Sequence, residues 1–185
     1  MFCQQLHSAL SSGQRSRHYM PSDNSTITSI QIPNSLIIPQ IIDLLNNGHT
    51  VTIKLKGISM RPFLENNRDK AVLKKADADC LKVGDAVLAE IRNKTYVLHR
   101  IIKIEGQNVT LQGDGNLSVE HCHINDVHGI ATGFYRKNHT YLDRTDGLKW
   151  KAYSFVWMKL SPIRRYLLAI HRRCIIPLTI TKFQR

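Results

Sequence analysis

Apolar positions first recur at helical spacing and then at every second residue. Isoleucine and leucine side chains share one face between residues 37 and 45, which predicts a helix of about three turns closed by Gly48. From Val51 to Lys56 apolar and polar residues alternate, as expected of a half-buried strand that runs into Ser59. The ordered part of the chain is therefore expected to open with a helix and a strand.

Short strands are expected throughout the middle of the chain. They are Ala71–Leu73, Ala86–Ile91, Thr95–Ile104, Val109–Gln112 and Val127–Tyr135, with a tight hairpin at Arg92–Lys94. Short strands so closely spaced by turns are typical of a β-barrel or sandwich rather than a parallel α/β sheet. The predicted fold class is mainly β, with helices at both ends.

The C-terminal part returns to helical spacing. Tryptophan, tyrosine and leucine share a face between residues 150 and 160, and Ser161-Pro162 can start a second helix. Its apolar stripe is Ile163, Tyr166, Leu167, Ile170 and Cys174, close to Arg164, Arg165, Arg172 and Arg173. Such a helix suits peripheral contact with anionic lipid through residues 161–174. The favoured alternative is packing on the β domain with solvated arginines.

Three regions follow from these patterns. Residues 1–33 are expected to be a disordered tail, residues 34–145 a β domain with its leading helix, and residues 146–185 basic amphipathic helices. The sequence has no apolar run of about eighteen residues, so no transmembrane helix is predicted. The N-terminus also lacks the apolar stretch of a secretory signal peptide.

Charge and cysteine content indicate which kinds of binding partner and which cellular compartment to expect. Lys and Arg number 26 against 14 Asp and Glu, a net charge of +12 that favours an anionic partner. The positive residues are dispersed without an aromatic stacking platform, so nucleic acid is not the expected partner. Cys3, Cys80, Cys122 and Cys174 form no C-x-x-C pair, which favours a reducing, cytoplasmic location.

Candidate chemistry centres on a serine and a histidine. Ser59 follows Gly57, which permits a sharp turn and a close approach of substrate, and precedes Pro62, which ends strand pairing. His99 lies within a predicted strand. A serine hydroxyl needs a neighbouring base to become a nucleophile, and histidine commonly has that role. Taken alone, a histidine among apolar residues is more often a structural core residue.

Two acids can complete such a site. Asp114 lies in Gly113-Asp114-Gly115-Asn116, a turn-forming segment, and Glu120 follows six residues later. Either carboxylate can hold an imidazole in one tautomer and stabilise its charged form. The sequence alone leaves both open.

A metal site is not expected, and neither is a cofactor. His121, Cys122 and His123 offer suitable ligand types near His128, but alternation on a strand would turn Cys122 away from its neighbours.

Five segments together resemble type I signal peptidases and the related LexA-like peptidases. They are Gly57–Pro62 (G-I-S-M-R-P), Gly84–Leu88, Val97–Ile101 (V-L-H-R-I), Gly113–Asn116 (G-D-G-N) and Gly129–Gly133. Their order and approximate spacing match the superfamily over roughly residues 49–137.

The resemblance implies a β-ribbon barrel whose groove binds an extended peptide of a precursor protein as an added strand. Bacterial members use lysine where this chain has His99, whereas the endoplasmic-reticulum and archaeal type has histidine in the same H-R-I context. On that analogy Ser59 is the nucleophile and His99 the base. In that branch the later of two acids orients the histidine. Glu120 has that position in this chain, where the branch usually has an aspartate. Asp114 retains the residue type and is slightly preferred.

The implied activity is serine-type peptide hydrolysis, related to signal-peptide processing. Family members usually have a membrane anchor, and none is predicted here. LexA-like relatives often cut themselves at Ala-Gly or Cys-Gly, and neither dipeptide precedes Ser59. A peptidase acting on another peptide therefore fits best. The alternative is an inactive peptide-binding module, or a nucleic-acid-binding regulator, with the same fold.

Overall fold

The fold begins with the predicted helix. The computed structural model describes residues 34–92, 94–137 and 139–175, so the predicted tail 1–33 lies outside the described residues. Helix α1 spans Asn34–Asn46, and Gly48 ends it with φ +82°. The Gly48 amide donates to the Leu45 carbonyl at 3.0 Å, a helix end that glycine favours.

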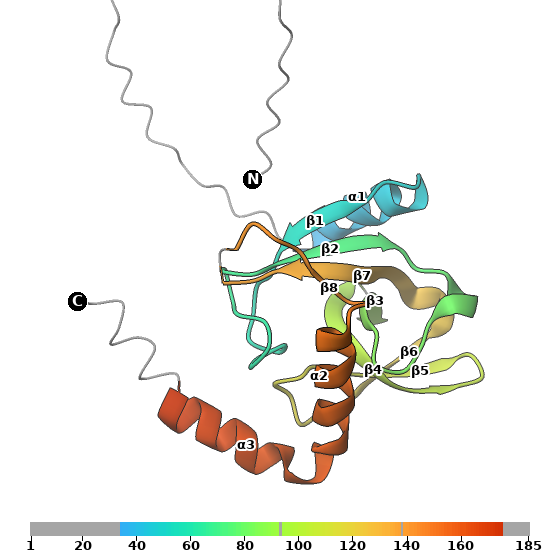
Figure 1. The fold of residues 1–185 in the computed structure, drawn as a ribbon. Helices are drawn as coiled ribbons and strands as arrows, with labels where there is room; N and C mark the ends of the chain where they lie inside the picture. The colour runs from blue at the N-terminus through green and yellow to red at the C-terminus, as the bar shows by residue number, and fades with distance from the viewer. Residues whose placement is uncertain (1–33, 93, 138, 176–185) are drawn as a thin grey trace, which may run out of the picture. The chain divides into compact units, whose positions relative to one another are not determined.

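Antiparallel strands form most of the remaining structure (Figure 1). The strands are β1 (Val51–Lys54), β2 (Lys70–Lys75), β3 (Ala86–Arg92), β4 (Thr95–Glu105), β5 (Asn108–Gln112), β6 (Glu120–His123), β7 (Val127–Tyr135) and β8 (Asp143–Arg144). All the predicted strands are present, whereas β6 and β8 were not predicted. One prediction is wrong in detail: β1 ends at Lys54, so Ser59 lies in a turn beyond the strand rather than at its end.

The sheet is open along its described path. Its order is β1-β2-β7-β3-β4-β5-β6, and β8 pairs with β7 outside this path. Among the described strands, no pairing joins β1 to β6. The mainly β prediction is confirmed, whereas a closed barrel is not observed.

Strand β3 lies between two apolar clusters. Ala86 and Leu88 belong to one, with α1, the Ser59 loop and Trp150, while Val87 and Ala89 belong to the other, with β4 and β5. Burial on both sides explains why β3 begins with four consecutive apolar residues rather than an alternating pattern. The central sheet is thereby fixed from both faces.

The C-terminal helices pack on this sheet by one face. Helix α2 spans Leu148–Lys159, a 3₁₀ turn covers Ser161–Ile163, and α3 spans Arg164–Ile170, followed by a π-helical turn at His171–Ile175. Trp150 and Trp157 are buried in α2, and Arg164 and Leu168 in α3.

The buried face of α3 is not the predicted apolar stripe. Ile163, Tyr166 and Ile170 are exposed instead. No helix within the described residues is long and apolar enough to cross a membrane.

Candidate active site

Ser59 lies in a loop that leaves the edge strand β1 and returns to β2. Gly57 adopts φ +98°, which confirms the sharp turn predicted there, and its amide donates to Asn66 Oδ1 at 2.8 Å. Ser59 itself is half-buried, between the exposed Ile58 and the buried Met60. The backbone just before Ser59 is therefore held in place by the hydrogen bond from Gly57 to Asn66.

A buried carboxylate closes the base of this loop. Asp69 Oδ2 accepts from the Glu65 amide at 2.8 Å, and Oδ1 accepts from Arg68 at 2.7 Å and from the Lys137 amide at 3.0 Å. Burial opposes ionisation, but these donors outweigh it and hold the pKa of Asp69 below its ordinary value. Hydrogen bonds through Asp69 therefore hold the loop to the start of β2 and to the end of β7.

His99 is buried in the middle of β4, with 4% of its surface exposed. Its ring Nδ1 lies 3.0 Å from Glu120 Oε2 at the start of β6. Facing a carboxylate, Nδ1 carries the proton, which leaves the lone pair on Nε2. Glu120 therefore fixes the tautomer that a general base requires.

Burial also keeps this imidazole neutral. It lowers the pKa of His99 below its ordinary value, although the charges of Glu120 and Asp114 act in the opposite direction. A neutral ring with a free Nε2 can accept a proton at physiological pH.

Asp114 is engaged elsewhere. Arg100, the residue after His99, points to the opposite face of β4 and donates to both carboxylate oxygens of Asp114, at 2.8 and 2.7 Å. Both side chains are 1% exposed. The slight preference for Asp114 as the acid that orients His99 is wrong in this geometry, because Glu120 makes that contact.

The Asp114 turn packs directly against the serine loop. Gly115 donates its amide to the Ser59 carbonyl at 2.7 Å. A Cβ at Gly113 would lie 2.5 Å from the Ser59 carbonyl oxygen and 3.0 Å from His99 Nε2, and a Cβ at Gly115 would lie 2.7 Å from the Ile58 carbonyl oxygen. Glycine is thus needed at both positions, and Nε2 of His99 lies on the side of the ring that faces the backbone of Ser59.

The serine hydroxyl itself is not bonded to the histidine in this state. Among the described residues, no hydrogen bond joins Ser59 to His99. The structure thus brings His99 together with Glu120, brings the serine loop against the Asp114 turn, and keeps Asp114 apart from the imidazole.

The C-terminal helices brace the same turn, a role that the sequence analysis missed. Tyr153 Oη donates to Asp114 Oδ2 at 3.1 Å, and Trp157 Nε1 donates to the Asp114 carbonyl at 3.1 Å. Arg172 reaches the Gly115 carbonyl at 3.2 Å. Arg100 also lies 4.5 Å from the centre of the Trp150 ring. The spacing of the aromatic residues was visible in the sequence. Nothing in the sequence indicated that they contact the Asp114 turn.

The other candidate groups take part in local contacts. His121 lies 3.3 Å from Thr110 Oγ1, and His123 Nε2 lies 2.8 Å from Gln107 Oε1. Burial raises the pKa of the Cys122 thiol to about 11. Within residues 34–175, apart from positions 93 and 138, no three His, Cys, Asp or Glu side chains are grouped to hold a metal.

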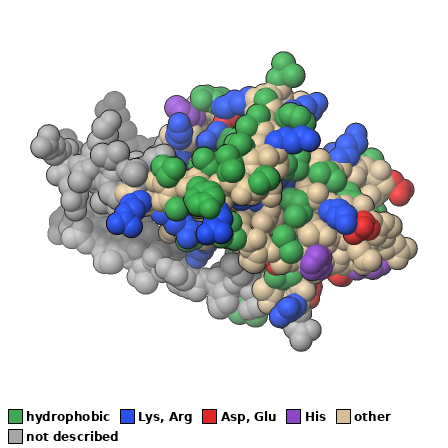
Figure 2. Space-filling model, turned by 90° about the horizontal axis from the view of Figure 1, so that it is seen from below, with side chains coloured by type: hydrophobic (Ala, Val, Ile, Leu, Met, Phe, Trp, Pro, Cys, Tyr) green, Lys and Arg blue, Asp and Glu red, His purple; other side chains and the backbone are tan. Residues whose placement is uncertain are grey.

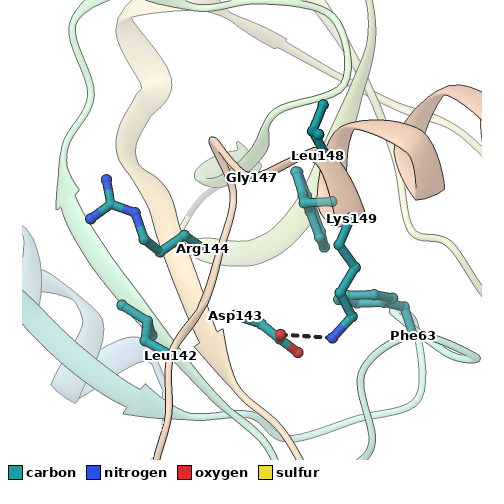
Figure 3. Close-up of a pocket in the computed structure, with 8 residues that line it drawn as sticks. Phe63, Leu142, Asp143, Arg144, Gly147, Leu148 and Lys149 are labelled. Atoms are coloured by element: carbon teal, nitrogen blue, oxygen red, sulfur yellow. Dashed lines mark hydrogen bonds and ion pairs between the residues drawn. The ribbon is translucent and has the colours of Figure 1, made fainter.

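A small cavity lies away from this site. Phe63, Leu142 and Leu148 are among its lining residues, and an ion pair between Lys149 and Asp143, 2.7 Å long, spans it (Figure 3). None of the four candidate site residues lines it. Lys149 and Asp143 are paired with each other, and Arg144 is paired with Asp146 outside the lining.

No family model matches the sequence, and no curated protein matches it.

Proposed function

We propose that this chain is a serine-type endopeptidase of the signal peptidase and LexA-like superfamily. The observation that carries the proposal is the arrangement around His99. Its Nδ1 is held by Glu120 at 3.0 Å, and its Nε2 lies next to the turn that packs on the Ser59 backbone. An oriented, neutral imidazole beside a loop serine is the arrangement that activates a hydroxyl nucleophile.

The proposed reaction is acyl transfer to Ser59. Nε2 of His99 takes the hydroxyl proton as Oγ attacks the peptide carbonyl, and Glu120 stabilises the resulting imidazolium. The proton then passes to the leaving amine, the peptide bond breaks, and an acyl-enzyme remains. Water activated by the same imidazole hydrolyses the ester and regenerates Ser59.

Stabilisation of the oxyanion is assigned to the Ser59 amide. Among the described residues, no acceptor is hydrogen bonded to this N–H, so it is available for the negatively charged oxygen. The Gly115 amide holds the carbonyl of Ser59, and thereby restrains the backbone next to the donor.

An extended peptide is the proposed substrate. Strand β1, which leads into the serine loop, is an edge of the described sheet and pairs only with β2 there. Edge strands offer unpaired backbone groups to an added strand. Ile58 precedes Ser59 in the sequence, and Leu117 and Val119 lie just before Glu120; their exposed fractions are 52%, 62% and 44%, so they can contact apolar side chains of the peptide.

One observation favours the second candidate, a peptide-binding module without catalysis. Ser59 is not hydrogen bonded to His99 within the described structure. Catalytic hydrogen bonds are often long in unliganded enzymes and tighten when substrate binds, so a chemical test is needed to separate the two functions.

The test is covalent labelling with an active-site serine phosphonate. We expect wild type to be labelled, and Ser59→Ala and His99→Ala to be unlabelled. Ser118→Ala and His121→Ala change exposed residues close by and provide matched controls with wild-type labelling. Absence of labelling in wild type, or labelling that is indifferent to His99, would refute catalysis and favour the binding module.

A further inference from the structure

The outer surface of the two C-terminal helices exposes large apolar side chains. These are Phe155, Val156, Ile163, Tyr166 and Ile170, with exposed fractions of 60%, 52%, 47%, 59% and 56%. In α3 and the turn before it, the last three are spaced by three and four residues and so share one face. We call these five residues the outer apolar face.

Cationic groups lie against this face. Lys159 Nζ lies 5.7 Å from the centre of the Phe155 ring, and the guanidinium of Arg165 lies 5.0 Å from that of Tyr166. The last acidic residue in the sequence is Asp146, so every charged residue after it is Lys or Arg. Figure 2 shows hydrophobic side chains interleaved with Lys and Arg on the face of the molecule seen from below.

The opposite side of the helices is already occupied. Arg164 is 3% exposed and donates to Gln112 Oε1 and to the Trp157 carbonyl, and Leu168 is 4% exposed. These contacts fix which side of α3 packs on the β domain. The outer apolar face is therefore held outward by the fold.

We propose that the outer apolar face binds the surface of an anionic lipid bilayer, with its helices lying in the plane of the headgroups. Apolar and aromatic side chains enter the interface while neighbouring Lys and Arg contact lipid phosphates. This inference goes beyond peptide hydrolysis and does not depend on it. It would place the Ser59 site next to a membrane.

Charge and composition favour lipid over the other partners. A second copy would bring one cationic face against another, which repels. Nucleic acid would satisfy the arginines but would gain little from the exposed aliphatic groups of Val156, Ile163 and Ile170, which contact neither phosphate nor base edges well.

Sedimentation of the full chain with vesicles tests the proposal. Vesicles of phosphatidylcholine alone are compared with vesicles containing phosphatidylglycerol as the anionic lipid. We expect Arg165→Gln with Arg173→Gln to weaken binding about 25-fold, from about fivefold for each cation near the surface. Ile163→Ser with Ile170→Ser should weaken it about tenfold or more through lost apolar burial.

Lys54→Gln with Lys70→Gln is the matched charge control. These lysines are exposed cross-strand neighbours on β1 and β2, and their removal lowers the net charge equally. Binding within about twofold of wild type is expected, since the Debye length of about 8 Å at physiological salt confines the attraction to charges near the lipid.

Three outcomes would overturn the inference. The first is no preference for anionic vesicles. The second is equal weakening by the control pair, which would indicate attraction by net charge alone. The third is tight binding to a nucleic-acid duplex that needs Arg165 and Arg173 but not the isoleucines, together with no vesicle binding. Phosphonate labelling of Ser59 is read separately, so failure of lipid binding and failure of catalysis are distinguishable.

Discussion

Replacing each of the two acids by its amide separates their roles. Glu120→Gln removes the charge that faces His99 Nδ1, and the amide can present either its oxygen or its NH₂ group there. Asp114→Asn removes the charge that faces Arg100. Both variants keep the size of the side chain, so a difference between them reports on the contact each acid makes.

The expected loss in Glu120→Gln comes from one charge-assisted hydrogen bond. The bond is 3.0 Å long and reaches a histidine side chain that is 5% exposed. Such a bond contributes about 2–3 kcal/mol, and it strengthens when the ring becomes charged in the transition state. At 1.36 kcal/mol per factor of ten, phosphonate labelling should slow about 30- to 150-fold.

Asp114→Asn should instead lower stability. Arg100 would keep a buried charge without its carboxylate, and breaking such a pair costs about 3–5 kcal/mol of the free energy of unfolding. Because Asp114 does not contact the imidazole, the folded fraction should be labelled at a rate within about threefold of wild type, the effect left by a distant charge.

The assay measures labelling rate and urea unfolding for both variants at a temperature where each is folded. Slow labelling in folded Asp114→Asn, with wild-type labelling in Glu120→Gln, would refute the assignment and restore Asp114 as the orienting acid. Equal slowing in both would show that the turn acts as a unit.

The remaining predictions concern the imidazole, the turn and its brace. Because burial lowers the pKa of His99, the labelling rate should be flat through neutral pH and fall only as the pH drops through that lowered value. Since the unfolded ring binds its proton nearer 6.5, unfolding should also become easier over that interval. Glu120→Gln should move the fall in labelling rate to lower pH. A fall at the same pH as in wild type would contradict the contact between Glu120 and His99. Gly113→Ala should abolish labelling, since its Cβ would meet the Ser59 carbonyl oxygen at 2.5 Å, whereas Gly147→Ala, with a nearest contact of 3.3 Å, should be labelled normally. Tyr153→Phe should lower the free energy of unfolding by about 1 kcal/mol through its lost bond to Asp114, measured by urea denaturation; an unchanged value would contradict that bond.

Most strands could be predicted because burial leaves a pattern in the sequence. The long strand β4 and the consecutive apolar start of β3 are both bounded by turn residues. Strand β6 could not be found in this way, because Glu120–His123 offers one partly buried Cys122 among polar residues. It is held by pairing with β5 rather than by an apolar face of its own. The early end of β1 likewise depends on Asp69, which lies fifteen positions after the strand's last residue, Lys54.

The choice between the acids required the register of the strands, which the sequence does not provide. Arg100 is paired with Gln112, so Asp114 follows two residues later on the side of the sheet that carries the arginine. Ile101 is paired with Leu111, which is paired with Glu120, so Glu120 lies on the other side, diagonal to His99. A register displaced by one residue would exchange the two acids. Residue type and spacing in one segment therefore could not decide between them.

The same register explains why the C-terminal helices belong to the site. On the arginine side of the sheet, Arg100 and Asp114 would form an ion pair open to water if nothing covered them, and exposed pairs contribute little. Tyr153 and Trp157 cover them and donate to Asp114, which leaves both charges 1% exposed. Breaking the covered pair is costly, because removing either partner would leave an isolated buried charge. Its turn holds the Ser59 carbonyl through Gly115, so the helices proposed to lie on lipid with their outer face also fix the backbone of Ser59, the proposed nucleophile, with their inner face.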